Sequence, residues 1–377
     1  EAGTACEDVP AVVKTATVDD IKSFMQELDE KSRKKLRQAI TSDTSEYLTR
    51  PTIFQRSGEG LSLDVLIELF MKDVEAGNLV LNNLPPCPPP RRGSSLRVAQ
   101  WNINALRGPH PYCSTKADGA TAASLLLSFM PDVLILQECG CMPSDIMVST
   151  KSYGEVTTMA NLLRDAGYEI FVANVRFPTA LATRLRTRSD IESLPLDKDE
   201  PDEARAALRV CICLPGEDAD EGAAITIYGT HLHHRNRVED MTERGGVRQS
   251  EAEALLQADC ALSERLPTLV VADFNQQRQQ DYSEDEWATI ITGKAMRGEA
   301  EHDGVCACFE AAGFTCSLDM HCEDRNWPSG ALPPATHWSG TAIDYSFAKG
   351  LVAQGMYVVP TTLSDHLPVV TDWEVVK

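Results

Sequence analysis

Between residues 17 and 40, apolar side chains recur mostly every three to four positions, which is the period of one face of a helix. Thr17 and Asp20 have the spacing of a capping box at the start of this segment. A second apolar stripe follows Ser62 and stops at Gly77, a residue suited to the end of a helix. These patterns predict a helical accessory module over residues 1–83.

Prolines crowd the segment that follows this module. Each proline removes a backbone hydrogen-bond donor and restricts the residue before it, so residues 84–94 cannot form a regular helix. We therefore expect a proline-rich linker at 84–94 and a separate domain over residues 95–377.

In residues 95–377, short apolar runs alternate with segments of helical period. Interspersed strands and helices predict an α/β domain in which helices cover the outer faces of layered sheets. The apolar runs predict strands at 96–101, 133–137, 224–230, 268–272, 342–347 and 369–373. The helical patterns predict helices at 117–130, 153–166 and 248–264.

The charge of the chain narrows the classes of partner. A formal net charge of -21 argues against tight, non-specific binding of duplex nucleic acid, which depends on Lys and Arg. The net charge does not exclude a phosphate substrate, because a bound cation reverses the electric field inside an acidic site. No apolar run approaches the about 20 residues of a membrane helix, so we expect no transmembrane segment. The chain starts at Glu1 without a methionine, so no signal or transit peptide can be read and the compartment stays open. We expect a soluble protein, with a lean to the cell interior or an organelle.

The twelve cysteines include pairs spaced two apart, but no Cys-x-x-Cys pair that would indicate a zinc ribbon. Two interpretations stay open. The first is a set of buried thiols or some disulfides, which we favour. The second is a metal clip made of Cys306, Cys308, Cys316, His321 and Cys322.

Polar side chains with metal-binding or acid–base chemistry stand at the ends of the predicted strands. Loops gather at such ends, so these side chains are candidates for one common site. The five groups are Gln100 to Asn104, Gln137 with Glu138, Thr230 to His234, Ala272 to Asn275, and Asp344 with Ser364 to Pro368.

These five groups, in this order, resemble the motifs of the endonuclease/exonuclease/phosphatase superfamily, which includes DNase I, apurinic endonucleases, inositol polyphosphate phosphatases, neutral sphingomyelinases and deadenylases. The resemblance covers residues 95–377. It implies a four-layer α/β sandwich of two mixed sheets flanked by helices, and hydrolysis of phosphoesters that depends on a divalent metal. Ala272 departs from the pattern, since the family usually has Gly before the Asp of this motif.

The resemblance also implies a cation site. Glu138 would be its main carboxylate ligand, with Asn102 and Asp365 beside the same ion. Asn104 would lie next to these residues and near the substrate. Magnesium is the expected ion, with manganese as a substitute, because carboxylate and amide oxygens suit hard cations.

The remaining motif residues would carry out the reaction. By the same resemblance, Asp273 would orient or deprotonate the attacking water, and Asn275 would hold the phosphate. His231 would donate to a phosphate oxygen, and His366, steered by Asp344, would complete the acid–base apparatus. A charged His366 near neutral pH requires a carboxylate partner such as Asp344 to raise its pKa.

Two further residues are candidates for substrate contact. Arg184 belongs to a locally basic run that could steer a phosphate chain, although a solvated surface explains the run equally well. Trp338 lies in a segment rich in Pro and Gly within the long insertion between Asn275 and Asp344, which we expect to shape substrate choice. Trp101 and Trp373 lie on predicted strands and are expected in the core.

Several interpretations compete at the level of function. A nucleic acid is the first substrate class, because nucleases are frequent in the superfamily, and a small molecule or lipid headgroup is the second. A third possibility is a non-catalytic scaffold whose helical module docks a protein partner. A serine triad at Ser364 to His366 is disfavoured, because neighbours in sequence cannot align as nucleophile, base and orienting acid. His233 and His234 lack the spacing of a metallo-β-lactamase site.

Overall fold

The structure is a computed structural model that describes residues 95–376. Within that range it leaves out 108–116, 140–149, 174, 176, 197–204, 215–223, 235–240, 242–245, 297, 301–303, 321–335, 338–340, 360 and 362. The predicted helical module at 1–83 and the predicted linker at 84–94 lie outside the described residues. In the described part, no helix combines the length and the apolar character that crossing a membrane would require.

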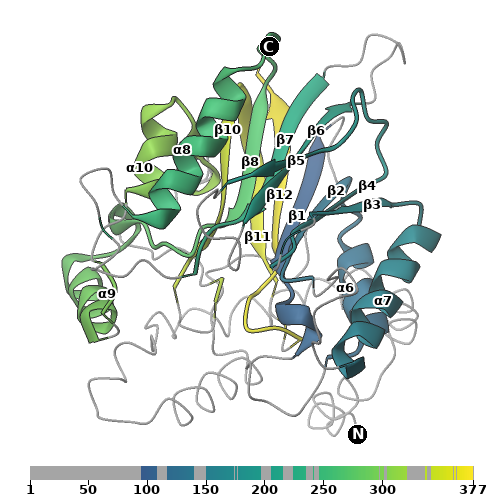
Figure 1. The fold of residues 1–377 in the computed structure, drawn as a ribbon, viewed down its shortest axis with the longest axis horizontal. Coiled ribbons are helices and arrows are strands. Elements are labelled where there is room, and N and C mark those ends of the chain that lie inside the picture. Colours follow the sequence, from purple (N-terminus) through teal and green to yellow (C-terminus); the bar gives the residue numbers. More distant parts are fainter. Residues whose placement is uncertain are drawn as a thin grey trace, which may run out of the picture. The chain divides into compact units, whose positions relative to one another are not determined.

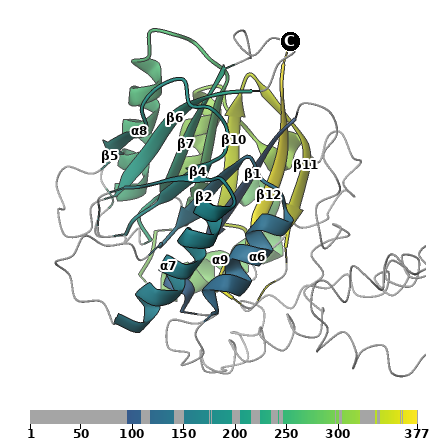
Figure 2. The ribbon, with the colours of Figure 1, turned by 90° about the vertical axis from the view of Figure 1, so that its right-hand side faces the viewer.

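Two mixed sheets form the centre of the domain (Figures 1 and 2). In the first sheet the strand order is β11-β12-β1-β2-β4-β3, where β1 runs parallel to β2 and antiparallel to β12. Its strands are β1 (Leu96–Asn102), β2 (Val133–Gln137), β3 (Glu169–Val172), β4 (Ala180–Thr183), β11 (Leu351–Val358) and β12 (Val369–Val375).

The second sheet has the strand order β5-β6-β7-β8-β10-β9. Strands β7 and β8 are parallel, and β10 runs antiparallel to β8. Its strands are β5 (Glu192–Pro195), β6 (Ala206–Cys213), β7 (Ala224–His231), β8 (Thr268–Asp273), β9 (Thr315–Cys316) and β10 (Asp344–Lys349).

Helices cover the outer face of each sheet. Helices α6 (Gly119–Ser128) and α7 (Thr150–Asp165) pack on the first sheet, and α8 (Val247–Cys260) and α10 (Val305–Ala311) pack on the second (Figures 1 and 2). The described part also holds α9 (Glu284–Met296) and the short 3-10 helices η1 (Asn104–Leu106) and η3 (Gln279–Asp281). The predicted four-layer α/β sandwich of two mixed sheets is confirmed.

The core consists of side chains that alternate between the two faces of each central strand. Successive side chains of a strand point to opposite faces of its sheet, so one set meets the other sheet and the next set meets the helices. In β8, Leu269 and Val271 join the apolar layer between the sheets, whereas Val270 and Ala272 pack toward the helices. Both faces of the central strands are therefore buried, which explains why they appear in the sequence as continuous apolar runs.

The layer between the sheets turns polar at one end. In β1 the inward set that begins with Leu96 and Val98 continues as Gln100 and Asn102, all of them buried. In β7 and β8 the corresponding last inward residues are His231 and Asp273, which pair in parallel register. Asp344 begins the antiparallel strand β10 directly opposite Asp273, so it lies at the same end.

Differences from the sequence prediction concern mainly strands at the sheet edges. The sequence did not indicate β3, β4, β5, β9 or β11, which are short, half-exposed or interrupted by a bulge, so that they carry no continuous apolar run. It also did not indicate β6, although this strand alternates between buried and half-buried residues. The core positions predicted for Trp101 and Trp373 are confirmed, because both are fully buried.

Gly229 lies in β7, two residues before His231, and faces Ile135 of the other sheet. A Cβ atom at Gly229 would lie 2.7 Å from Cδ1 and 2.9 Å from Cγ2 of Ile135, across the layer between the sheets. We expect Gly229→Ala to destabilise the fold by about 1–3 kcal/mol, because its methyl group overpacks this layer. The free energy of unfolding in urea measures the effect.

Gly154→Ala is the matched control. A Cβ atom at Gly154, within α7, meets no heavy atom within 4 Å, so this change should stabilise the helix by about 0.5–1 kcal/mol. Equal free energies of unfolding for the two alanine variants would show that the sheets have room at Gly229.

Candidate active site

Asn102, at the end of β1, connects carboxylates that belong to the two different sheets. Its Nδ2 donates to Oδ2 of Asp273 at 3.0 Å and to Oε1 of Glu138 at 3.3 Å. Its Oδ1 accepts the backbone N–H of Asn104 at 3.0 Å, which fixes the orientation of the amide. Asn102 therefore presents hydrogens to the acidic groups and holds them in place.

Three residues around this cluster adopt left-handed backbone conformations, with φ of 46° at Asn104, 51° at Glu138 and 52° at Asn275. Such conformations cost a non-glycine residue of the order of 1 kcal/mol or more, and they concentrate at functional sites. Hydrogen bonds support the turn after β2, since the carbonyl of Glu138 accepts the N–H of Ala105 at 2.8 Å. This hydrogen bond helps to hold Glu138 at a defined position beside the cluster.

His366 and Asp344 form a buried pair. Nδ1 of His366 lies 2.9 Å from Oδ2 of Asp344, whose Oδ1 accepts Nε2 of Gln100 at 3.1 Å. The indole N–H of Trp101 donates to the backbone carbonyl of His366 at 3.0 Å. These contacts fix the imidazole so that its Nε2 faces Oδ2 of Asp273 at 3.7 Å.

The surroundings of His366 favour its charged form. Burial by itself lowers the pKa of His366, but the negative charges of Asp344 and Asp273 outweigh burial and raise the pKa to about 10. His366 is therefore an imidazolium at neutral pH, as the sequence predicted for a histidine paired with Asp344.

His231, at the end of β7, is in the opposite state. Burial, followed by the positive charge of Arg205, holds the pKa of His231 well below its usual range. Nη1 of Arg205 lies 3.0 Å from Nδ1 of His231, and the side-chain amide nitrogen of Asn275 lies 3.0 Å from Nε2. Nε2 also lies 3.5 Å from Oδ2 of Asp273.

Asp273 lies at the centre of these groups. Burial and the nearby charge of Asp344 raise the pKa of Asp273 to about 7, although His366 and the hydrogen bond from Asn102 oppose the rise. Its Oδ1 accepts the backbone N–H of Asn275 at 2.9 Å. A carboxyl group with this pKa can exchange a proton near neutral pH, which suits a general base.

The loop that follows β8 is anchored from helix α8. Nη1 of Arg248 donates to the backbone carbonyl of Asn275, and Nδ2 of Asn275 donates to the carbonyl of Leu232 at 3.0 Å. The structural role that the sequence suggested for Arg248 is confirmed. Asn275 is consequently held between the two loops that carry His231 and Asp273.

Glu138 and Asp365 have the chemistry of a cation site. Desolvation raises the pKa of Asp365 to about 6, while the charge of His366 lowers it and the charge of Glu138 raises it further. The side chain of Glu138 is 31% exposed, so an ion can reach it. Two carboxylates whose negative charges repel each other offer the oxygen ligands that Mg²⁺ prefers, and these residues therefore fit such an ion.

Arg184 does not lie at this site. Strands β2 and β4 are antiparallel, with Val133 opposite Thr183, so Arg184 lies beside Asp132 at the start of β2. The six residue steps along β2 from Asp132 to Glu138 correspond to about 20 Å, at roughly 3.3 Å per residue. The predicted contact of Arg184 with a substrate stays a prediction. Its Nη2 donates to the carbonyl of Met130 at 3.0 Å.

Other candidates from the sequence have mixed outcomes. Trp338 lies outside the described residues, as do His321 and Cys322 of the suggested metal clip. Among the described cysteines, none belongs to a group that could hold a metal ion, and none is in a disulfide. His233 and His234 stack with ring centroids 4.9 Å apart, the former half-buried and the latter exposed.

Two residues of the network, Arg205 and Thr336, were missed in the sequence. Gln100, which belongs to the first polar group, shares the inward face of β1 with Asn102. Nothing local marks Arg205 as the partner of His231 or Thr336 as a support of Asp344. Oγ1 of Thr336 accepts the backbone N–H of Asp344 at 3.2 Å, and its carbonyl accepts the N–H of Leu367, next to His366, at 2.8 Å.

The charge on His366 can be tested through Asp344. In metal-free protein, Asp344→Asn should lower the pKa of His366 from about 10, because it removes the negative charge that raises this pKa most. The pKa of His366 in the folded state lies above the 6.5 of an exposed histidine, so its protonation stabilises the fold fully below pH 6.5. This contribution is lost as the pH rises through about 10. Nitrogen NMR of histidine rings during a pH titration measures the pKa.

Asp372→Asn serves as the control, since Asp372 pairs with Arg97 at 2.7 Å and not with a histidine. An unchanged pKa of His366 in the Asp344 variant would contradict the assignment of this pair.

Solved structures of other proteins have a similar fold. Two of the solved structures that match are an endonuclease/exonuclease/phosphatase from Beutenbergia cavernae and the human Nocturnin catalytic domain with bound sulfate anion. The first has a TM-score of 0.51 and 18% identity over 76% of this chain and 72% of that chain. The second has a TM-score of 0.50 and 19% identity over 75% of this chain and 96% of that chain. At these low sequence identities, the similarity shows a shared fold alone. No curated protein matches the sequence.

The model of the endonuclease/exonuclease/phosphatase family matches residues 99–366, a range that begins next to Gln100 and ends at His366. It therefore includes all the polar groups that the structure brings together. This chain belongs to the endonuclease/exonuclease/phosphatase family.

Proposed function

We propose that this protein is a divalent-metal-dependent phosphodiesterase that hydrolyses a phosphoester bond with water. The observation that carries the proposal is the position of Asp273, whose pKa is about 7, between a charged His366 and a neutral His231. A phosphodiester is anionic, so its hydrolysis needs a base for water and positive or hydrogen-bonding groups for the developing charge. These three residues supply both.

Glu138 and Asp365 would hold the cation, and Asn102 would keep Glu138 and Asp273 at a fixed separation. We propose Mg²⁺ as the ion, with Mn²⁺ as a substitute, because the ligands are oxygens. When bound, the cation stabilises negative charge on the phosphoryl oxygens.

The protein side chains would divide the proton transfers among them. Asp273 takes the proton of the attacking water while the new O–P bond forms. The imidazolium of His366 lies 3.7 Å from Asp273 and provides a proton for the oxygen that leaves as the old P–O bond breaks. His231 and Asn275, whose side-chain nitrogens Nε2 and Nδ2 lie 3.0 Å apart, would donate to the phosphoryl group.

The first substrate class in this proposal is a nucleic acid strand, on the ground that nucleases are frequent in the family, which is an argument by analogy. The second is a small-molecule or lipid-headgroup phosphoester, favoured by the net charge of -21, which disfavours a long anionic chain. Rates on single-stranded DNA and RNA, compared with rates on inositol phosphates and sphingomyelin, separate the two classes.

A scaffold that retains only the fold is the competing proposal. Buried ionisable groups lower stability unless they are paired, and groups with strongly shifted pKa values concentrate at functional sites. Asp273, Asp344 and His366 are all buried within one network. A scaffold would gain nothing from these groups, so their retention favours an enzyme.

Replacement of the base tests the mechanism. We expect Asp273→Asn to lower kcat on bis(4-nitrophenyl) phosphate with Mg²⁺ by about 10²–10⁴-fold, the usual contribution of general base catalysis. Asp281→Asn is the matched control, because Asp281 is also a buried carboxyl whose pKa is raised to about 7, but it lies beside Arg278. Equal turnover by wild type and Asp273→Asn would contradict the assigned base, and no Mg²⁺-dependent turnover by wild type would favour the scaffold.

The cation site has a separate test. Glu138→Ala should raise the Mg²⁺ concentration needed for half-maximal turnover by about tenfold or more, because a direct carboxylate ligand is lost. A Mg²⁺ titration of turnover, repeated with Mn²⁺, measures the shift. The same Mg²⁺ requirement in wild type and Glu138→Ala would contradict the assigned ligand.

A further inference from the structure

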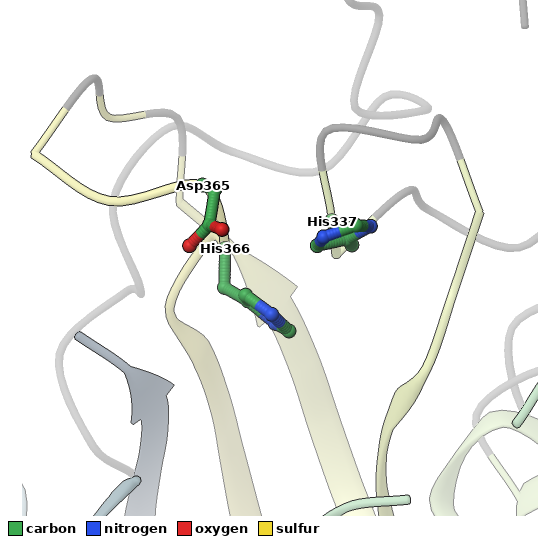
Figure 3. Close-up of side chains that lie close together, drawn as sticks. All are labelled: His337, Asp365 and His366. Carbon is green, nitrogen blue, oxygen red and sulfur yellow. The ribbon is translucent and has the colours of Figure 1, made fainter. Parts of the chain in front are cut away.

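A third histidine lies against the active site and has no part in the proposed reaction. His337 pairs with His366 as an isolated antiparallel bridge, and the two ring centroids are 4.5 Å apart. Asp365 is the neighbour of His366 in the chain. One nitrogen of each ring and one carboxylate oxygen of Asp365 all lie within 4.8 Å of one another. Figure 3 shows the three side chains close together.

The geometry points to a second cation site made of His337, Asp365 and His366, which takes a nitrogen-preferring transition ion, Zn²⁺ above all. Two imidazoles and one carboxylate are a common ligand set for zinc, with the fourth position open to water. Mg²⁺ prefers oxygen ligands, so the two sites differ in the metal that they select. Only Asp365 would belong to both.

The contacts of His366 support this ligand set. Its Nδ1 is directed at Oδ2 of Asp344, 2.9 Å away, which leaves Nε2 as the nitrogen that can bind an ion. A histidine ligand whose other nitrogen donates to a carboxylate is the usual arrangement in zinc sites, since the carboxylate orients the ring and makes it more basic. The ion takes the place of the proton on Nε2.

The site needs a small contraction before an ion fits. Ligands of a tetrahedral zinc ion are about 3.4 Å apart when the bonds measure about 2.0–2.1 Å, whereas the present atoms are within 4.8 Å. His337 and Asp365 are half-buried, so their side chains can turn inward, whereas His366 is buried and fixed.

Zinc at this site inhibits the proposed hydrolysis. It occupies Nε2 of His366, which is the proposed proton donor, and it competes for Asp365 with the ion bound by Glu138. This consequence rests on the proposed function, whereas the binding of zinc does not. The inference therefore predicts a Mg²⁺-dependent enzyme whose activity falls when Zn²⁺ is present.

The full chain, stripped of metal, tests the site by competition between the protein and a zinc-binding dye. We expect His337→Phe, which retains a ring without nitrogens, to weaken one class of Zn²⁺ binding by about tenfold or more. His234→Phe makes the same change at an exposed histidine and should leave that binding class unchanged. If His337→Phe does not fold, His337→Gln provides the same comparison with a polar side chain.

The outcomes are distinct. Equal Zn²⁺ affinity of wild type and the His337 variant, or a loss confined to the His234 variant, overturns the site. In the Mg²⁺-dependent assay, the inhibition constant of Zn²⁺ should rise in the His337 variant, each rate being compared with that variant's own rate without zinc. Zinc binding that depends on His337, in a protein without hydrolase activity, supports the metal site and rejects the proposed function.

Discussion

The charged groups of the candidate active site are buried between the two sheets. Because water is largely excluded there, each of them needs an opposite charge or a hydrogen-bond partner. Asp344, Asp273 and His366 satisfy this constraint together: the imidazolium lies 2.9 Å from one carboxylate and 3.7 Å from the other. Removal of one member would leave the others buried without compensation. The register of β8 and β10, which places Asp344 opposite Asp273, brings the two carboxylates together.

The same constraint gives the two histidines opposite chemistry. His366 faces carboxylates and is charged, whereas His231 faces the guanidinium of Arg205 and is neutral. One residue type therefore supplies a positively charged imidazolium and a neutral imidazole within a single site. Neither state is a property of the residue alone, since burial lowers the pKa of both and only the neighbouring charge separates them.

The sheets contribute rigidity as well as position. Gln137 donates to the carbonyl of Thr230 at 3.2 Å and so connects β2 with β7 just below the polar end. Gln100, in the next strand, supports Asp344 in the second sheet. Side chains on central strands of two packed sheets move little, which is the condition for hydrogen bonds and charges to act in a preorganised way.

The sequence alone determined the layered α/β fold and most of the residues that meet in the site. Buried central strands are continuous apolar runs, and polar residues that follow such runs stand out; Asn102, Glu138 and Asp273 were found in this way, and the order of the groups carried the family resemblance. The amino-terminal segment and Trp338 lie outside the described residues, so those predictions stay open.

Tertiary structure alone decided which side chains pair. The partner of His231 is Arg205, 26 positions away, and Asp344 depends on Gln100, 244 positions away. The antiparallel register of β2 and β4 likewise placed Arg184 at the far end of the sheet. Strand order and register depend on packing between distant segments, and the charge of a buried group depends on what that packing brings near it. Local patterns of residues therefore predict where strands end, but not which side chains meet there or which of them are charged.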